Sequence, residues 1–198
     1  LRFNSIEFIG EETFVFNKNL REINLVNNPI KFIGKNSFNG LKFFLLADIF
    51  RQKSIEYIDD CAFCGLARNQ ENIRMDKNMI CLLKNQTFND LNSTRVLNLN
   101  QNKMNLIENG VFYNMKSLVK LELNSNLLTK INNIIFNFLD SLEYLDLRNN
   151  KLVEIENMAF IRLIKLKGLY LSFNKIQFIN NYTFANLINL EILELNNN

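Results

Sequence analysis

Apolar residues recur along the chain with a spacing of about 24 residues. Each unit places leucines or isoleucines ahead of an asparagine and a phenylalanine behind it. The unit that starts at Leu118 reads Leu118, Leu121, Leu123, Asn126, Leu128, Ile131, Phe136 and Leu139. The phenylalanines of the series are Phe14, Phe38, Phe63, Phe88, Phe112, Phe136, Phe160 and Phe184. Self-similarity at a period of roughly 20 to 50 residues predicts an array of stacked structural repeats.

The spacing within one unit predicts its local structure. The last two leucines before the asparagine, such as Leu145 and Leu147, alternate with polar residues, which predicts a short strand with one face inward and a parallel sheet once the units stack. The asparagine that follows, Asn150 here, is expected inside the turn, where its amide pairs with backbone groups of its own and the next turn. The phenylalanine and the leucine three residues later have helical spacing and are expected to cover the convex side of the core.

These residues resemble the typical leucine-rich repeat, L-x-x-L-x-L-x-x-N-x-L-x-x-I/L-x-x-x-x-F-x-x-L, of Toll-like receptors, neuronal adhesion proteins and small matrix proteoglycans. The resemblance covers essentially the whole chain. It implies an α/β repeat solenoid, a leucine-rich-repeat horseshoe with a parallel β-sheet on the concave face and short helical or irregular segments on the convex face. The consensus positions are the buried ones, so the motif specifies the fold far more closely than the function.

The repeat spacing divides the chain into units. We expect residues 1–198 to be one leucine-rich-repeat domain and an uncapped interior fragment. Its divisions are a partial repeat 1–19, repeats near 20–43, 44–69, 70–93, 94–117, 118–141, 142–165 and 166–189, and a partial repeat 190–198. The register slips by one residue between Phe38 and Phe63, where Gln52 or Lys53 replaces the expected asparagine, and again near residues 68–70. A one-residue slip turns side chains to the opposite face, so we expect a strained or bulged strand in the first of these stretches.

Composition narrows the range of functions. Apolar residues make up 47% of the chain and charged residues 22%, which is typical of a folded protein. The net charge of +3 comes from scattered lysines and arginines without a basic run, so we expect no nucleic-acid partner. No apolar run approaches the roughly 18 residues of a membrane span, and no targeting segment is recognisable, so membrane association is expected only through segments outside this chain.

The sequence contains no histidine. A Ser-His-Asp triad, a Cys-His nucleophile pair and a histidine metal site are therefore excluded. The carboxylates are scattered along the chain, and the adjacent Asp59 and Asp60 are expected to be solvated on a loop. We accordingly expect no catalytic residues, no metal site and no cofactor.

The three cysteines, Cys61, Cys64 and Cys81, lie in or just after the irregular stretch. A zinc site would need further ligands that the chain lacks, and a redox motif would need a different structural context. We expect free thiols, with one local disulfide as the alternative.

Three sequons mark glycan acceptors in a secreted protein, at Asn85, Asn92 and Asn181. Because asparagine is so abundant, two or three sequons are also expected by chance. Asn85 and Asn181 occupy the same repeat position, three residues before the phenylalanine, which is expected on the accessible outer side.

The variable strand positions form the surface that solenoids use to bind partners. Two successive strands are expected to present one contiguous aromatic and charged patch, and the candidate ligand-binding residues are Glu122, Tyr144, Asp146, Arg148, Tyr170 and Phe173. Tyrosine and arginine are enriched at binding hot spots, and the acidic edge at Glu122 and Asp146 suits a basic partner. The alternative is that Arg148 only balances the carboxylates and that Phe173 packs over its own turn.

The resemblance points to a protein-protein recognition module within the extracellular or cell-surface part of a receptor or adhesion protein, with a protein ligand on the concave face. Two alternatives stay open, a secreted extracellular-matrix structural protein and an intracellular scaffold. Neither the identity of the ligand nor the oligomeric state follows from the sequence.

Overall fold

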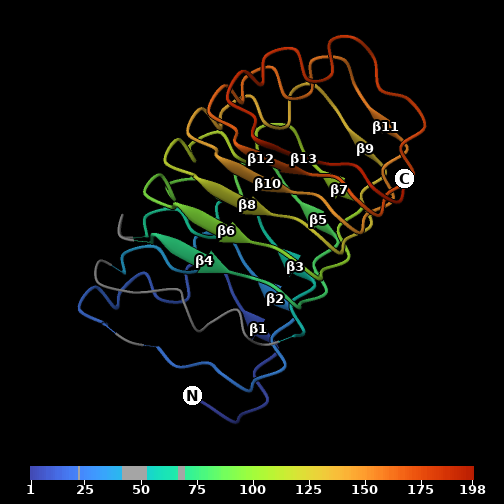
Figure 1. The fold of residues 1–198 in the computed structure, drawn as a ribbon. Coiled ribbons are helices and arrows are strands. Elements are labelled where there is room, and N and C mark those ends of the chain that lie inside the picture. The colour runs from blue at the N-terminus through green and yellow to red at the C-terminus, as the bar shows by residue number, and fades with distance from the viewer. Residues whose placement is uncertain (22, 42–52, 67–69) are drawn as a thin grey trace.

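The chain winds into a solenoid in which each repeat makes one turn (Figure 1). The structure is a computed structural model, and it describes residues 1–21, 23–41, 53–66 and 70–198. Within each sheet, neighbouring turns hydrogen-bond through parallel strands. The buried apolar side chains form one continuous cluster from Ile9 to Leu187. The sequence-based prediction of a leucine-rich-repeat solenoid is confirmed.

Six three-residue strands form one parallel sheet on the concave face, in the spatial order β13-β12-β10-β8-β6-β4. They are β4 (Asn72–Arg74), β6 (Val96–Asn98), β8 (Lys120–Glu122), β10 (Tyr144–Asp146), β12 (Gly168–Tyr170) and β13 (Ile192–Glu194). The middle residue of β4, β6, β8, β10 and β12 is buried in the core, as Leu121 and Leu145 are, whereas Leu193 of the last strand, β13, is 40% exposed. The buried middle position fits the period of two that the sequence pattern predicted.

The back of each turn carries a second, shorter set of strands. These are β1 (Phe8–Ile9), β2 (Phe32–Ile33), β3 (Tyr57–Ile58), β5 (Leu82–Leu83), β7 (Leu106–Ile107), β9 (Lys130–Ile131) and β11 (Glu154–Ile155). They pair in parallel as β1-β2-β3, β5-β7 and β9-β11, and the second residue of each is buried. The described residues contain no α-helix, because the helical spacing from Phe136 to Leu139 is realised as a single turn closed by the Leu139 N–H on the Phe136 carbonyl at 3.2 Å. One isolated turn is too short to propagate a helix.

The repeat phenylalanines form an unbroken ladder of rings through the core. Successive rings from Phe14 to Phe184 lie 5.9 to 6.4 Å apart between centroids, with interplanar angles between 6° and 20°. These distances suit offset stacking of aromatic rings. The six rings from Phe38 to Phe160 are fully buried, so their role is structural, as expected.

The buried asparagines form a second ladder. The Nδ2 group of Asn150 donates to the carbonyls of Leu147 (3.1 Å), Leu123 (3.0 Å) and Arg148 (3.3 Å), and its Oδ1 accepts the Leu128 N–H (3.0 Å). Asn102, Asn126 and Asn174 make the same contacts one or more repeats away. The expectation that each amide reaches the next turn is wrong in direction, because Leu123 and Leu128 belong to the preceding turn. The asparagine follows the strand of its own turn, and the backbone groups that its side chain contacts there belong to its own turn and to the preceding one.

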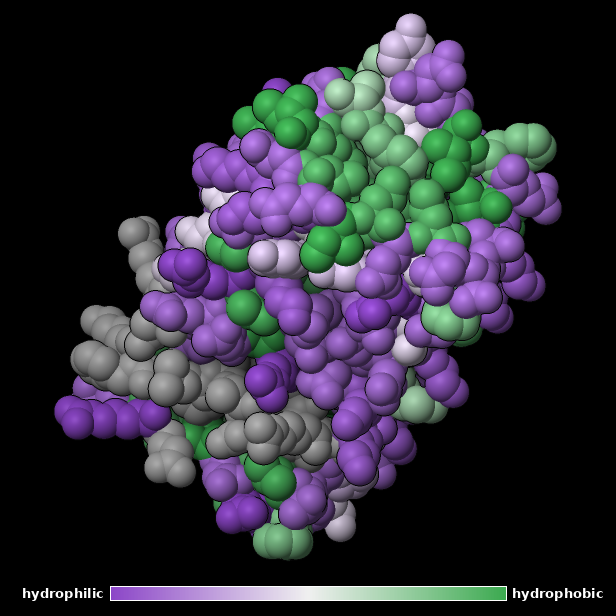
Figure 2. Space-filling model, in the orientation of Figure 1, coloured by the Kyte–Doolittle hydropathy of each residue, from purple (hydrophilic) through white to green (hydrophobic). Residues whose placement is uncertain are grey.

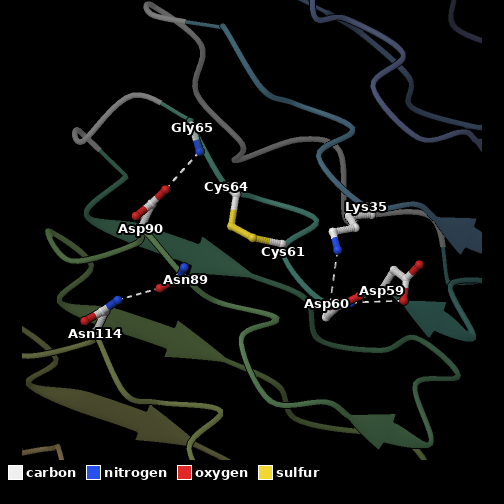
Figure 3. The surroundings of a disulfide bond; sticks show 9 residues. All are labelled: Lys35, Asp59, Asp60, Cys61, Cys64, Gly65, Asn89, Asp90 and Asn114. Carbon is white, nitrogen blue, oxygen red and sulfur yellow. Dashed lines mark hydrogen bonds and ion pairs between the residues drawn. A yellow bond between two sulfur atoms is a disulfide. The ribbon is translucent and has the colours of Figure 1, made fainter.

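The irregular stretch holds a disulfide between Cys61 and Cys64 (Figure 3). The expectation of free thiols is wrong for this pair and the local-disulfide alternative is right, while Cys81 is free and exposed. The Cys64 N–H bonds the Cys61 carbonyl at 3.0 Å, and this turn brings the two Cα atoms to 4.9 Å, within the usual range of roughly 4.4 to 6.8 Å. An ion pair between Lys35 and Asp60 (3.7 Å) flanks the bridge.

The expected strained strand at 44–50 and the extra residue near 68 lie outside the described residues. So does Gln52, one of the two positions at which we expected a replaced asparagine.

Candidate binding surface

The strand register brings four of the candidate residues together. Tyr144 of β10 pairs with Lys120 of β8 and with Gly168 of β12, and the second row of the sheet aligns Glu122, Asp146 and Tyr170. In a parallel sheet, neighbouring strands are roughly 4.8 Å apart, so the outward side chains in each row touch or nearly touch. The position of these four residues follows directly from the repeat spacing.

Arg148 lies two residues after the end of β10 and contacts side chains of three neighbouring strands. Its Nε donates to Asp146 Oδ1 (3.0 Å) and its Nη2 to Oδ2 (2.6 Å), a two-pronged pair in which the Asp146 side chain is almost fully buried. The hydrogen bond to Asp146 raises the pKa of Arg148 further above its ordinary value, and its Nη1 lies 3.7 Å from Glu194. The guanidinium also lies 5.1 Å from the centre of the Tyr170 ring, within the range of a cation–π contact.

A hollow of about 430 Å³ lies over these strands. Its lining consists of Lys120, Leu121, Glu122, Tyr144, Asp146, Arg148 and Tyr170. Lys120 and Glu122 form an ion pair at 2.6 Å on one side, opposite the Arg148 and Asp146 pair. The hollow therefore combines two tyrosine rings with charges whose positions are fixed by partners on the same strands.

Gly168 makes room for the two tyrosines. A Cβ atom at this position would lie 3.0 Å from Tyr144 Cδ1, from Tyr170 Cε2 and from the Tyr170 hydroxyl. Any larger residue would have to push at least one ring aside. Gly168 thus shapes the hollow although it supplies no side chain to it.

Phe173 is the candidate that does not join the hollow. It lies three residues after the end of β12 with a left-handed backbone (φ 60°), and the residue is 51% exposed. The same repeat position has positive φ in Lys77, Gln101, Ser125 and Asn149, so the turn imposes this conformation. A bulky aromatic residue adopts it only rarely.

Sequence reasoning did not single out Lys120 or Gly168 as site residues. Both occupy variable strand positions of the repeat, but nothing in the sequence marked the pairing of Lys120 with Glu122. A glycine in a strand does signal close approach of another group, and that signal was available at Gly168.

The three sequon asparagines are all exposed. Their threonines, Thr87, Thr94 and Thr183, are buried. The predicted glycan acceptors are therefore accessible, and their modification stays a prediction.

Other site types are not found in the part of the chain that the structure describes. No group of three or more cysteine, aspartate or glutamate side chains could hold a metal ion there. None of its elements is a helix that could cross a membrane. Figure 2 shows hydrophobic side chains gathered toward the C-terminal turns, and the exposed apolar residues there include Phe178, Ile188 and Leu193.

Comparison with known proteins agrees with the repeat geometry. A family model described as "Leucine rich repeat" matches residues 68–128, 117–176 and 140–198. No curated protein sequence matches the chain.

Two solved structures are similar over nearly the whole chain. The crystal structure of a TLR13–ssRNA13 complex superposes with a TM-score of 0.77 at 27% identity and covers 96% of this chain. The glycosylated Toll–Spatzle complex of Drosophila superposes with a TM-score of 0.81 at 24% identity and covers 99%. This chain spans only 27% and 28% of the length of those two chains. The similarity to Toll concerns the fold alone.

Proposed function

We propose that this chain, which belongs to the leucine-rich-repeat family, is a recognition module of a receptor ectodomain that binds a protein ligand in the concave hollow. The observation that carries the proposal is the fixed arrangement of Tyr144, Tyr170 and Arg148. Tyrosine and arginine dominate binding hot spots, which lie in well-packed pockets rather than on flat surfaces. The proposal goes beyond the similarity to Toll-like receptors, because it assigns the ligand to the part of the sheet that lines the hollow.

The internal pairing of Arg148 favours binding. Holding a long side chain in one position normally costs entropy when a ligand arrives. Here the bonds to Asp146 and the contact with Tyr170 already restrict the guanidinium before binding. The pairing of Arg148 with carboxylates is compatible with this role, because Tyr144 and Tyr170 both remain partly exposed beside it.

The charges of the hollow favour a protein over a nucleic acid. The neighbour TLR13 is described in complex with ssRNA and the neighbour Toll with Spatzle, so both ligand classes occur on this fold. In this chain three carboxylates, Glu122, Asp146 and Glu194, surround the two cations of the hollow. Phosphate binding depends on unpaired lysines and arginines, so a basic or neutral protein surface fits better.

An extracellular location is part of the proposal. The disulfide between Cys61 and Cys64 supports it, because such bonds persist in oxidising compartments. Cell-surface receptor, adhesion and innate-immunity roles are proposed by similarity to the Toll-like neighbours, with a matrix structural protein as the alternative and an intracellular scaffold disfavoured by the disulfide. Both cations of the hollow are held in ion pairs with carboxylates and the sequence has no histidine, so we propose binding without catalysis.

The test uses the full-length protein, whose partner is first captured by chemical crosslinking and identified. The Kd of that partner is then measured for the wild type and for each variant. Tyr170→Ala is expected to weaken binding by at least about 1 kcal/mol, the threshold of a contributing interface residue. Arg148→Ala is made together with Asp146→Asn, because removing the arginine alone would leave a buried carboxylate without its partner.

Lys165→Ala, an exposed change outside the sheet, is the control and is expected to leave Kd unchanged. Loss of binding in Lys165→Ala with wild-type affinity in the two concave variants would place the ligand elsewhere.

Gly168→Ala is expected to weaken binding without lowering the melting temperature. The added methyl group meets side-chain atoms of Tyr144 and Tyr170 at 3.0 Å, so these rings must shift by a few tenths of an ångström, and alanine reduces the entropy of the unfolded chain. The expected cost in binding is about 1 kcal/mol, because the hollow loses its shape. Unchanged affinity in this variant would show that the ligand does not use the two rings as they lie here.

A further inference from the structure

A second hollow lies on the outside of the solenoid, away from the sheet positions discussed above. It measures about 420 Å³, within the roughly 300 to 1,000 Å³ of small-ligand clefts. Its lining includes Asn85, Gln86, Asn89, Tyr113, Asn114 and Phe138, and it contains no charged side chain. A neutral ligand with many hydrogen-bonding groups fits this lining, because each side-chain amide offers both donors and an acceptor.

An exposed aromatic ring stands beside the amides. Tyr113 is 56% exposed and is braced edge-on by Phe138, with ring centroids 4.8 Å apart and an angle of 68°. The Asn114 amide donates to Asn89 Oδ1, which fixes two of the polar groups next to the ring (Figure 3). An aromatic face flanked by amides matches a sugar ring, which has apolar C–H faces and a polar rim.

Asn85 is both part of this hollow and the first residue of a sequon. Its side chain lies over Gly110, where a Cβ atom would be 2.9 Å from Asn85 Oδ1 and where the backbone has φ +84°. Asn85 is exposed, and its side-chain amide makes no hydrogen bond within the described part of the chain. A group attached to the Asn85 nitrogen would therefore start at the edge of the hollow.

Thr87, the third residue of that sequon, gives independent support. Its Oγ1 is the buried side-chain oxygen for which the described residues supply no hydrogen-bond partner. Of the equivalent positions, Ala62, Val111, Ile135 and Ala159 are apolar, whereas the hydroxyls of Thr13, Ser37 and Thr183 each have a partner. The Thr13 and Ser37 hydroxyls lie 2.8 Å from the Gly10 carbonyl, and Thr183 Oγ1 lies 3.0 Å from Asn180 Oδ1. Folding therefore gains nothing from the Thr87 hydroxyl and is disfavoured by burying it. Recognition of the sequon by a glycosylating enzyme before the chain folds accounts for the threonine.

We propose that this second hollow is a carbohydrate site occupied by the first sugars of an N-linked glycan on Asn85, with an N-acetylhexosamine ring against Tyr113. In the attachment step the Asn85 amide nitrogen attacks the anomeric carbon of a lipid-linked oligosaccharide pyrophosphate. The new C–N bond forms as the C–O bond to the pyrophosphate breaks, the lipid pyrophosphate leaves with the bonding electrons, and the amide loses one proton to a base of the transferase. This proposal rests on the extracellular location included in the proposed function.

The experiment uses the full-length protein secreted from eukaryotic cells. Mass spectrometry measures glycan occupancy at Asn85, Asn92 and Asn181, and hydrogen exchange measures protection of residues 110–114. The glycan is expected to slow exchange there by about two- to tenfold relative to Asn85→Gln, the strength of one aromatic stacking contact. Tyr113→Ala is expected to remove this difference while leaving occupancy unchanged.

Thr87→Val is the matched control, because it keeps the buried shape and removes the sequon. It is expected to match Asn85→Gln in exchange of residues 110–114 and to fold at least as stably as the wild type. Glycosylated Asn85 without added protection of residues 110–114 would overturn the carbohydrate site but not the extracellular location. Unmodified Asn85 with glycans at Asn92 or Asn181 would do the same, and so would protection of 110–114 in a protein whose Asn85 is bare. A protein that reaches no glycosylating compartment would overturn this proposal together with the extracellular location.

Discussion

Phe136→Ala is expected to lower the free energy of unfolding of the surrounding repeats by about 3 to 5 kcal/mol, the range for truncating a buried phenylalanine. Phe136 is fully buried between Phe112 and Phe160, whose ring centroids lie 6.4 and 6.1 Å away. Its loss opens a cavity and also breaks the ring ladder on both sides. Hydrogen exchange of residues 118–165 in the full-length protein measures the effect repeat by repeat, because each repeat contacts only its neighbours.

Phe178→Ala is the control for this variant. Phe178 is 78% exposed, so the change is expected to stay within about 0.5 kcal/mol. A similar small loss for Phe136 would mean that the phenylalanine ladder does not hold the convex side of the core.

Asn150→Ala is expected to cost at least about 2 kcal/mol, because it leaves a buried donor unpaired. The Leu128 N–H loses Oδ1 as its acceptor. The carbonyls of Leu123 and Leu147 each keep a bond from a neighbouring asparagine, Asn126 and Asn174 respectively, and lose only one of two. Urea unfolding, followed by exchange at residues 123–150, measures the loss.

Asn149→Gly is the matched comparison. Asn149 is exposed and has a left-handed backbone (φ 53°), which glycine adopts without strain, so the variant is expected to stay within about 0.5 kcal/mol of the wild type. Equal losses in the two variants would contradict the register in which Asn150 is the inward residue.

The repeat spacing was sufficient to predict the solenoid and the alignment of Tyr144, Asp146 and Tyr170. These features depend on positions that recur every 24 residues or so, and a period is visible in a single sequence. The buried positions of the repeat phenylalanines and asparagines were predictable for the same reason.

Features that depend on one repeat alone were harder to predict. The contacts of Arg148 with Asp146, Tyr170 and Glu194 are choices of rotamer, and sequence spacing does not determine them. The pairing of Cys61 with Cys64 depends on a local turn inside an irregular stretch. Phe173 was expected in the patch, on the concave side of the sheet, but it lies in the left-handed turn after β12 and does not line the hollow.

The second hollow also could not be predicted from the repeat pattern. Asn85 was recognisable as a sequon residue, but its neighbours Tyr113 and Phe138 come from the two following repeats. The unpaired hydroxyl of Thr87 could be recognised only once its surroundings were known.

Hydroxyl-radical footprinting of the full-length protein, alone and with its bound partner, tests most directly whether the concave hollow is the binding surface. Tyrosine reacts readily, and the chain supplies matched rings, with Tyr144 and Tyr170 in the hollow and the exposed Tyr113 and Tyr182 outside the sheet. If the partner binds in the concave hollow, it protects Tyr144 and Tyr170 and leaves Tyr113 and Tyr182 as reactive as before. Protection of Tyr113 or Tyr182 with unchanged Tyr144 and Tyr170 would contradict binding in the concave hollow.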